Sequence, residues 1–342
     1  MLRYEKVNGG STQERVAVVA GCDIVFEEPA LGLNQIELAY MITKKLLGAT
    51  GLKPDDINLV IDSGSDFLDG RGISSCMTVD AMTANRKEES KVEQDGIFAA
   101  YYGFMRVAAG QYDTALMVSY GKPSFSSPFD QTNSIAEPFF SRPLGIDWLS
   151  MAALQASAYK KKYGVSDEAA AALAAKNKNG YLRRYGKHGS ITARDVLESG
   201  VAMEPLREKE IAFPVDGACA ILLASEKAAP SLCEKPAWIA GVGLASDCHY
   251  PGMRDMTSVL SAERAAAAAY RMAGIKDPRK EIDAVEAAAD TVYQEMMLYE
   301  ALGFSEKGGG SGMMNEKVNP SGGSLGANPY LSTGLVRLKE AP

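Results

Sequence analysis

Short apolar segments of strand type alternate with segments of helical periodicity along two stretches of this 342-residue chain. The first stretch covers about residues 16–119 and the second about residues 218–302. Because alternating β and α segments pack as a parallel sheet covered by helices on both faces, the pattern predicts an α/β protein built in two halves. The Ser-, Pro- and Phe-rich segment 123–143 and the helical patterns after it predict an insertion between the halves.

Individual elements can be predicted from the apolar spacing and the capping residues. One helix starts after Asn34 and ends near Gly48 and Gly51, and Asn177, Asn179 and Gly180 predict an interruption in the helix at 166–185. The predicted strands are 16–20, 58–62, 114–119, 218–224, 237–244 and 282–287, and the other predicted helices are 97–109, 148–163, 262–273 and 293–302.

The composition excludes several classes of protein. Hydrophobic residues make up 46% and charged residues 23%, as in a packed globule, and a net charge of −7 offers no cationic surface for nucleic acid. Five cysteines form no C-x-x-C pair and there are only two histidines, which argues against a metal site and favours a reducing compartment. Met1–Gly10 lacks the apolar core of a signal peptide and no apolar run is long enough to span a bilayer, so a soluble, cytoplasmic protein is predicted.

A basic cluster lies in the helix predicted at 166–185. It contains Lys176, Lys178, Arg183 and Arg184, with tyrosines between them. Two interpretations stay open: a solvated helix face, or a patch that receives the phosphates of an acidic ligand such as coenzyme A.

Specific strings resemble thiolases of the sterol-carrier-protein type, in the family's order and over nearly the whole chain. They include Trp148-Leu149-Ser150-Met151-Ala152-Ala153, Tyr163-Gly164-Val165, Asp216-Gly217-Ala218, Glu300-Ala301-Leu302-Gly303-Phe304 and Asn319-Pro320-Ser321-Gly322-Gly323. The resemblance implies an α-β-α-β-α layered sandwich of two similar halves with an inserted loop domain, usually paired as a dimer. It divides the chain into an N-terminal half (1–122), a loop domain (123–210) and a C-terminal half (211–342).

The same resemblance implies catalysis by an acylated cysteine in a C-x-S-G element, yet the corresponding positions read Glu93-Gln94-Asp95-Gly96. No cysteine occurs between Cys76 and Cys219, so a shifted alignment cannot supply one. Glu93 and Asp95 stand where a helix N-terminus favours negative charge. Three interpretations remain: Asp95 caps the helix, a carboxylate acts as a base in an aldol-type or decarboxylative step, or the side chain plugs the pocket.

The remaining catalytic loops of the family also differ here. The positioning loop reads Glu286-Ala287-Ala288-Ala289-Asp290-Thr291, with alanines in place of its polar pair, and the histidine loop carries Asn328 beside Pro329. Asparagine can exchange hydrogen bonds but cannot act as a general base. The family's second cysteine would follow Gly334, eight residues before Pro342. Either the sequence is incomplete, or the last helix and final strands of the C-terminal half are absent.

Two further residues are candidates for acid or base groups. His249 lies in the only Cys-His neighbour pair, and it is either structural or faces the pocket. Tyr330 follows the proline of the altered histidine loop, and some thiolase-like aldolases dispense with the cysteine and depend on tyrosine.

These observations predict a thiolase-like subunit of a heteromeric acyl-CoA-processing complex that lacks the usual nucleophile. The resemblance implies association with a second thiolase-fold chain, as a homo- or heterodimer, or with a small zinc-ribbon and OB-fold subunit. The ligand would be coenzyme A or acyl-CoA, with no covalently bound cofactor. Two alternatives stay open: a retro-aldolase or acyltransferase with a recast acid/base site for a bulky CoA thioester, and an acyl-CoA or lipid binding protein without chemistry.

Overall fold

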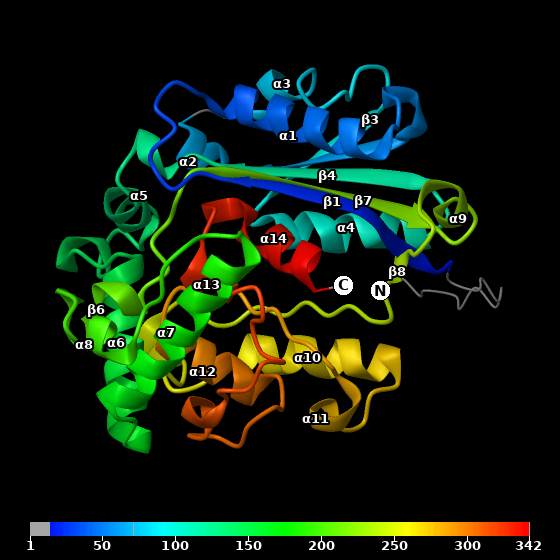
Figure 1. Ribbon diagram of the computed structural model, residues 1–342. Helices are drawn as coiled ribbons and strands as arrows, with labels where there is room; N and C mark the ends of the chain where they lie inside the picture. Colours follow the sequence, from blue (N-terminus) through cyan, green and yellow to red (C-terminus); the bar gives the residue numbers. More distant parts are fainter. Residues whose placement is uncertain (1–13, 71, 342) are drawn as a thin grey trace, which may run out of the picture.

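The computed structural model describes residues 14–70 and 72–341. Met1–Gly10, for which the sequence predicts no signal peptide, lies outside the described residues. Figure 1 shows a central sheet with α1 (Gln35–Thr50) and α3 (Ser75–Thr78) on one face. Helices α4 (Gly96–Ala108) and α14 (Thr333–Glu340) lie on the other face, and α10 (Leu260–Ala273) and α12 (Val292–Ala301) form a layer beyond them. The layered α/β architecture predicted from the sequence is confirmed.

The central sheet has six strands, and it is mixed rather than parallel. Its order is β3 (Glu88–Glu93), β2 (Leu59–Gly64), β4 (Thr114–Gly121), β7 (Gly217–Ser225), β1 (Val16–Val25) and β8 (Ala237–Trp238). Strand β2 runs parallel to β3 and β4, whereas β7 runs antiparallel to both β4 and β1. Gly121 at the end of β4 pairs with Gly217 at the start of β7, so the chain leaves and re-enters the sheet at one end and β7 must run back.

The insertion between β4 and β7 is largely helical. It contains α5 (Pro128–Ile135), α6 (Trp148–Tyr163), α7 (Asp167–Arg184), α8 (Ala193–Leu197) and the hairpin β5 (Val201–Met203) and β6 (Leu206–Arg207). The predicted interruption of α7 is wrong. Asn177 donates to the buried Glu295 carboxylate, and Gly180 lets the helix approach the backbone of Gly322, so tertiary contacts stabilise residues that weaken an isolated helix.

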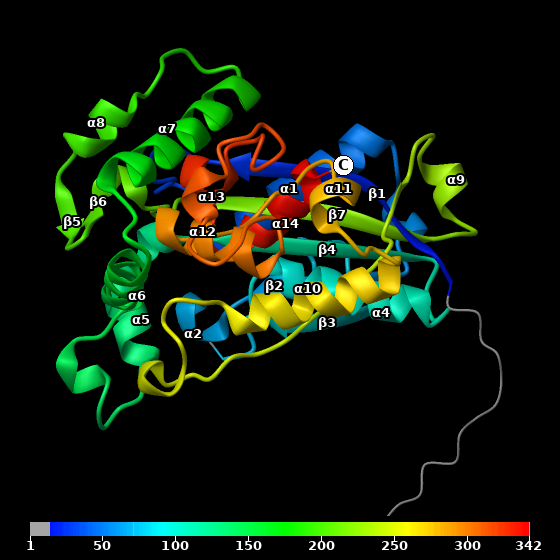
Figure 2. The same ribbon diagram turned by 90° about the horizontal axis from the view of Figure 1, so that it is seen from below.

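After β7, the second half contributes extended segments rather than long strands in the described residues. The strand predicted at 237–244 is reduced to the two residues of β8, and the one predicted at 282–287 makes only the isolated bridge Val285–Val318. Glycines at 241 and 243 let the segment after β8 pack tightly on the backbone of α10. Figure 2 shows α10 in front of α4 and β3. The division into domains at residues 122 and 210 stays a prediction.

Helices α4 and α14 meet at their N-termini beneath the sheet. A Cβ atom on Gly96 would lie 2.5 Å from Leu335 Cγ, so only glycine permits this approach. The short helices α2 (Asp66–Asp69), α9 (Ala229–Leu232), α11 (Pro278–Glu281) and α13 (Gly323–Gly326) complete the described helices. Among the described residues, no helix combines the length and apolar character required to cross a membrane.

Candidate active site

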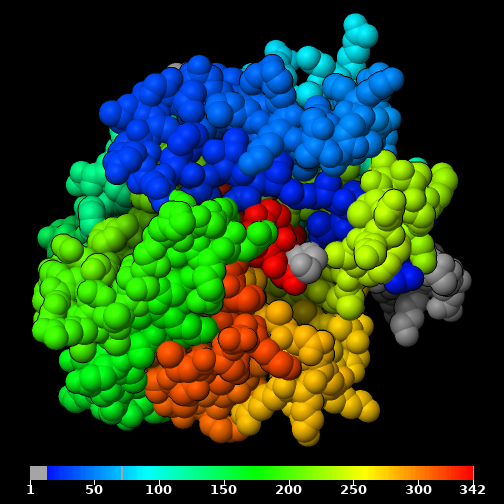
Figure 3. All heavy atoms as spheres, viewed as in Figure 1, coloured from blue at the N-terminus to red at the C-terminus, as the bar shows by residue number. Residues whose placement is uncertain are grey.

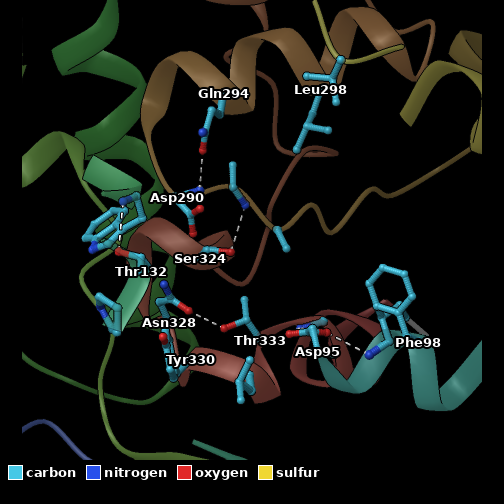
Figure 4. A pocket seen from close by; sticks show the side chains of 18 of the residues that line it. Asp95, Phe98, Thr132, Asp290, Gln294, Leu298, Ser324, Asn328, Tyr330 and Thr333 are labelled. Atoms are coloured by element: carbon cyan, nitrogen blue, oxygen red, sulfur yellow. Dashed lines mark hydrogen bonds between the residues drawn. The ribbon is translucent and has the colours of Figure 1, made fainter. Parts of the chain in front are cut away.

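A cavity of about 590 Å³ opens where α4 and α14 begin. Figure 4 shows that its side chains come from segments far apart in the sequence, and we call it the central cavity. The insertion contributes Thr132, Trp148 and Gln155, and the second half contributes Arg254 and Val259. The polar side chains that matter most below are Asp95, Asp290, Ser324, Asn328, Tyr330 and Thr333.

Asp95 caps α4 and also holds the start of α14. Its Oδ1 accepts a hydrogen bond from Ile97 N at 2.8 Å, and its carboxylate accepts from Gly334 N at 3.0 and 3.1 Å. These donors favour the charged form, but burial outweighs them and, with the Asp290 charge, raises the pKa of Asp95 to about 6. The carboxyl group therefore changes its charge close to neutral pH.

Asp290 supplies the second carboxyl group of the central cavity. It precedes Thr291, the N-cap of α12, and its backbone N donates to Gln294 Oε1 at 3.0 Å. Its side chain opens into the cavity beside Ser324 and Asn328, as Figure 4 shows. The protein around the cavity desolvates this carboxyl group and raises the pKa of Asp290 above its ordinary value, although the residue is exposed through the open cavity.

Tyr330 sits in a strained backbone conformation with φ of 51°. Such a left-handed conformation costs a non-glycine residue about 1–2 kcal/mol. A Cβ on Gly121 would lie 2.7 Å from Tyr330 Cβ, so the end of β4 has room for this residue only because it is glycine. Burial and the Asp290 charge raise the pKa of Tyr330 to about 12, which keeps its phenol neutral and able to donate.

Asn328 is fixed by bonds on both ends of its amide. Its Nδ2 donates to Ala212 O at 2.8 Å, and its Oδ1 accepts from the Thr333 hydroxyl group. The side chain thus ties the loop before β7 to the start of α14. It therefore supports the shape of the central cavity.

Aromatic and aliphatic side chains form the rest of the wall. Trp148 stacks on Phe129 with ring centroids 5.9 Å apart and meets Phe213 edge-on at 6.2 Å. Phe98, Val259 and Leu298 add apolar surface. A cavity with this lining and a few polar groups suits a ligand that is apolar over much of its length.

The structure separates two of the predicted residues from the central cavity. Glu93 is exposed at the end of β3, and its Oε1 accepts from Asp66 N at 2.6 Å, so it links β3 to α2. His249 is exposed, with its ring edge-on to Tyr250 at 5.6 Å. Neither lines the central cavity, whereas the predicted Asp95, Asn328 and Tyr330 all do.

The four basic residues proposed as a phosphate patch do not gather into one. The Lys176 and Lys178 ammonium groups donate to the carbonyl oxygens of Val318 and Leu325. Arg184 pairs with Glu340 at 2.6 Å, and Arg183 is exposed. The helical periodicity turns the two lysines inward and the two arginines outward, so the structure does not support a single phosphate site here.

None of the five cysteines, all within the described residues, lines the central cavity. In the part of the chain that the structure describes, no three His, Cys, Asp or Glu side chains are grouped to hold a metal ion. The polar side chains that line the cavity carry carboxyl, phenol, hydroxyl, amide and guanidinium groups.

Asp290 and Arg254 are not among the site residues predicted from the sequence, yet both line the central cavity. Asp290 had a signal, because it is the one charged side chain between Glu286 and the helix cap Thr291 in the loop aligned with a catalytic loop. Arg254 lies in a loop without a motif, so its position in the cavity could be found only from the tertiary structure.

Comparisons with known proteins relate the sequence and the fold of this chain to one family. The model of the family "Thiolase C-terminal domain-like" matches residues 244–333. The acetyl-CoA acetyltransferase of Methanothermobacter thermautotrophicus is 26% identical over 350 residues, which cover 95% of this chain and 89% of the relative. The benzoylsuccinyl-CoA thiolase subunit BbsB of Thauera aromatica is 27% identical over 185 residues, or 52% of this chain and 46% of the relative.

Solved structures agree on the fold. The Ltp2-ChsH2(DUF35) aldolase superposes with a TM-score of 0.80 at 20% identity, covering 94% of this chain and 88% of the other. Human mitochondrial 3-ketoacyl-CoA thiolase superposes with a TM-score of 0.72 at 16% identity, covering 95% and 91%. Together with the family model and the relatives, these structures confirm the resemblance to the thiolase superfamily read from the sequence.

Proposed function

We propose that this chain binds acyl-CoA thioesters in the central cavity and cleaves a carbon–carbon bond of the acyl group by a retro-aldol step. The observation that carries this proposal is the meeting of two carboxyl groups of raised pKa and a neutral tyrosine in a cavity lined by no cysteine. The names of the relatives, an acetyl-CoA acetyltransferase and a CoA thiolase subunit, support a CoA thioester as the ligand.

The proposed step needs one base, one acid and one hydrogen-bond donor. Asp95, mostly ionised above pH 6, accepts the proton of a 3-hydroxyl group on the acyl chain. The Cα–Cβ bond then breaks, and its electron pair moves into the thioester to form an enolate while the hydroxyl carbon becomes a carbonyl. Tyr330 donates a hydrogen bond to the enolate oxygen, and Asp290 in its protonated form delivers a proton to Cα. The products are a ketone or aldehyde and a shortened acyl-CoA.

A non-catalytic thiolase-fold subunit is the second candidate function. It is favoured by the bonds of Asp95 to both Ile97 N and Gly334 N, which are what a purely structural cap would make. In either case we propose that the chain works in a complex, because the names Ltp2-ChsH2(DUF35) aldolase and subunit BbsB describe multi-component proteins. A second thiolase-fold chain and a small zinc-ribbon and OB-fold subunit are the proposed partners.

The test is a product assay with branched 3-hydroxyacyl-CoA thioesters, in which the released carbonyl compound and the shortened acyl-CoA are quantified together. We expect D95N, D290N and Y330F each to lower the rate by about 100-fold or more. E93Q is the matched control, since Glu93 is a carboxylate two residues from Asp95 that lies outside the central cavity.

Three other outcomes would decide against the proposal. Thiolysis of acetoacetyl-CoA by free coenzyme A would show that a thiol-based mechanism operates. Turnover unchanged by D95N and D290N would place the chemistry elsewhere. Tight binding of the thioester without turnover, including in the presence of the copurified partners, would favour the non-catalytic or binding function.

A further inference from the structure

Arg254 is a cation in the central cavity whose side chain pairs with no other side chain in the described residues. It lines the cavity just after the turn at Pro251–Met253 and is half-buried. Its Nε atom is buried and makes no hydrogen bond, and within residues 14–70 and 72–341 its guanidinium group forms no ion pair. Because a partly desolvated cation loses hydration, an unpaired guanidinium group in a cavity indicates that a ligand supplies its counter-charge.

The carboxyl groups nearby do not fill this role. A guanidinium group close to Asp95 or Asp290 would lower the pKa of that carboxyl, yet both pKa values are raised and no cation opposes the rise. Asp255, the next residue along the chain, is engaged elsewhere. Its carboxylate accepts from the Thr257 backbone N and hydroxyl group and pairs with Lys162 at 3.5 Å.

A second unsatisfied donor lies in the wall of the same cavity. Trp148 Nε1 is buried and has no hydrogen-bond partner in the described residues. The indole ring is held in place by Phe129 and Phe213, so its N–H direction is set by packing. Buried hydrogen-bond donors are rarely left without an acceptor. Two such donors on the wall of one cavity therefore predict a ligand whose acceptor atoms bind there.

We propose that the acyl group of the substrate carries a carboxylate, and that Arg254 binds it inside the central cavity. This inference rests on the proposed function, because it specifies the acyl-CoA class. The planar guanidinium fork matches a carboxylate with two parallel hydrogen bonds. The phosphates of coenzyme A carry the same type of charge, but the pantetheine arm holds them far from the thioester. An anion that shares a cavity with Asp95 and Tyr330 therefore belongs to the acyl chain.

The experiment compares four probes on the full chain: succinyl-CoA, butyryl-CoA and the succinyl and butyryl thioesters of N-acetylcysteamine, which have no phosphate. Binding is followed by calorimetry and by Trp148 fluorescence in a W238F background, since the chain has two tryptophans. We expect the succinyl probe to bind about tenfold more tightly than the butyryl probe on both carriers. R254Q should remove this preference and leave butyryl binding unchanged, and R254K should retain part of it.

R183Q is the control, because Arg183 is exposed and outside the central cavity. A succinyl preference that survives R254Q overturns the proposal. So does an R254Q defect that weakens both CoA probes equally and spares the N-acetylcysteamine probes, since this identifies phosphate as the ligand. Equal binding of succinyl and butyryl probes overturns this inference alone, whereas no binding of any probe overturns the proposed function with it. Unchanged thermal midpoints in the R254Q and R254K variants separate these outcomes from misfolding.

Discussion

At Asp95, hydrogen bonds and burial have opposite effects on the pKa of the carboxyl group. Two backbone N–H groups stabilise its charge, as expected for a residue that caps α4 and contacts the start of α14. Burial in the wall of the central cavity has the larger effect and raises its pKa. A solvent-exposed helix cap would have a lowered pKa, so burial rather than capping decides the direction of the shift at Asp95.

This shift makes the free energy of unfolding depend on pH. The pKa of Asp95 is about 6 in the folded chain, above the ordinary pKa of 3.8, so the folded state binds more protons between these two pH values. The stability contributed by the protonated carboxyl is therefore present below pH 4 and is lost as pH rises through 6. We expect D95N to gain roughly 1–3 kcal/mol relative to the unmodified chain between pH 4 and pH 8.

Denaturant unfolding of both proteins at a series of pH values measures this difference. The raised pKa of Asp62, also about 6, acts in the same direction but is common to both proteins and cancels. E93Q serves as the reference for loss of an exposed carboxylate. A difference between D95N and the unmodified chain that is constant with pH would contradict the raised pKa.

At the scale of elements, some boundaries could be predicted and others could not, for physical reasons. Helix α1 was predicted because Asn34 forms a capping box with Glu37 and Gly51 takes a left-handed conformation, both of which are local features. Strand β3 was missed because Glu88-Glu89-Ser90-Lys91-Val92-Glu93 has no apolar alternation. It is an edge strand whose side chains are largely exposed, so burial does not select them.

The strand predicted at 282–287 is wrong because an apolar pattern does not guarantee a pairing partner. Its apolar residues favour an extended conformation, which the chain adopts, but only Val285 finds a bridging partner, at Val318. Pairing depends on which other segments come near, and the sequence pattern does not contain this information. The same limit holds for the residues that line the central cavity. Asp95, Asn328 and Tyr330 lie in segments that the resemblance aligns with catalytic motifs, whereas the position of Arg254 in the cavity depends on tertiary contacts.

Two helical glycines give a matched test of how packing decides the effect of one methyl group. Gly48 in α1 has no atom within 4 Å of an added Cβ, whereas a Cβ on Gly180 in α7 would lie 3.0 Å from Gly322 Cα and N. We expect G48A to stabilise the protein by about 0.5–1 kcal/mol through helix propensity. G180A should destabilise it by roughly 1–3 kcal/mol, because fixed backbone atoms cannot move aside. Urea unfolding measures both, and the same sign for the two variants would contradict this account of the α7 contact.

At the scale of the whole molecule, α14 joins the layers. It packs on α4 below the sheet, and Figure 3 shows its last residues at the surface between the N-terminal part and the second half. Arg337 in α14 pairs with Glu286 of the second half at 3.0 Å, and both also contact Ser321. The side chains are only 5% and 1% exposed, so this ion pair lies inside the junction that also positions the central cavity.

A double-mutant cycle on Glu286 and Arg337 tests whether the layers unfold as one unit. E286M or R337M alone leaves one buried charge without its partner, and we expect each to lower the free energy of unfolding by about 3–5 kcal/mol. E286M/R337M removes both charges and should recover most of that loss, which gives a large coupling energy in denaturant unfolding. The exposed pair Arg194–Glu198, 84% and 61% exposed, is the control, and E198Q should change stability by less than about 0.5 kcal/mol. Additive effects of the two single variants would show that Glu286 and Arg337 do not act as a pair. Two separate unfolding transitions would show that α14 does not join the N-terminal part and the second half into one cooperative unit.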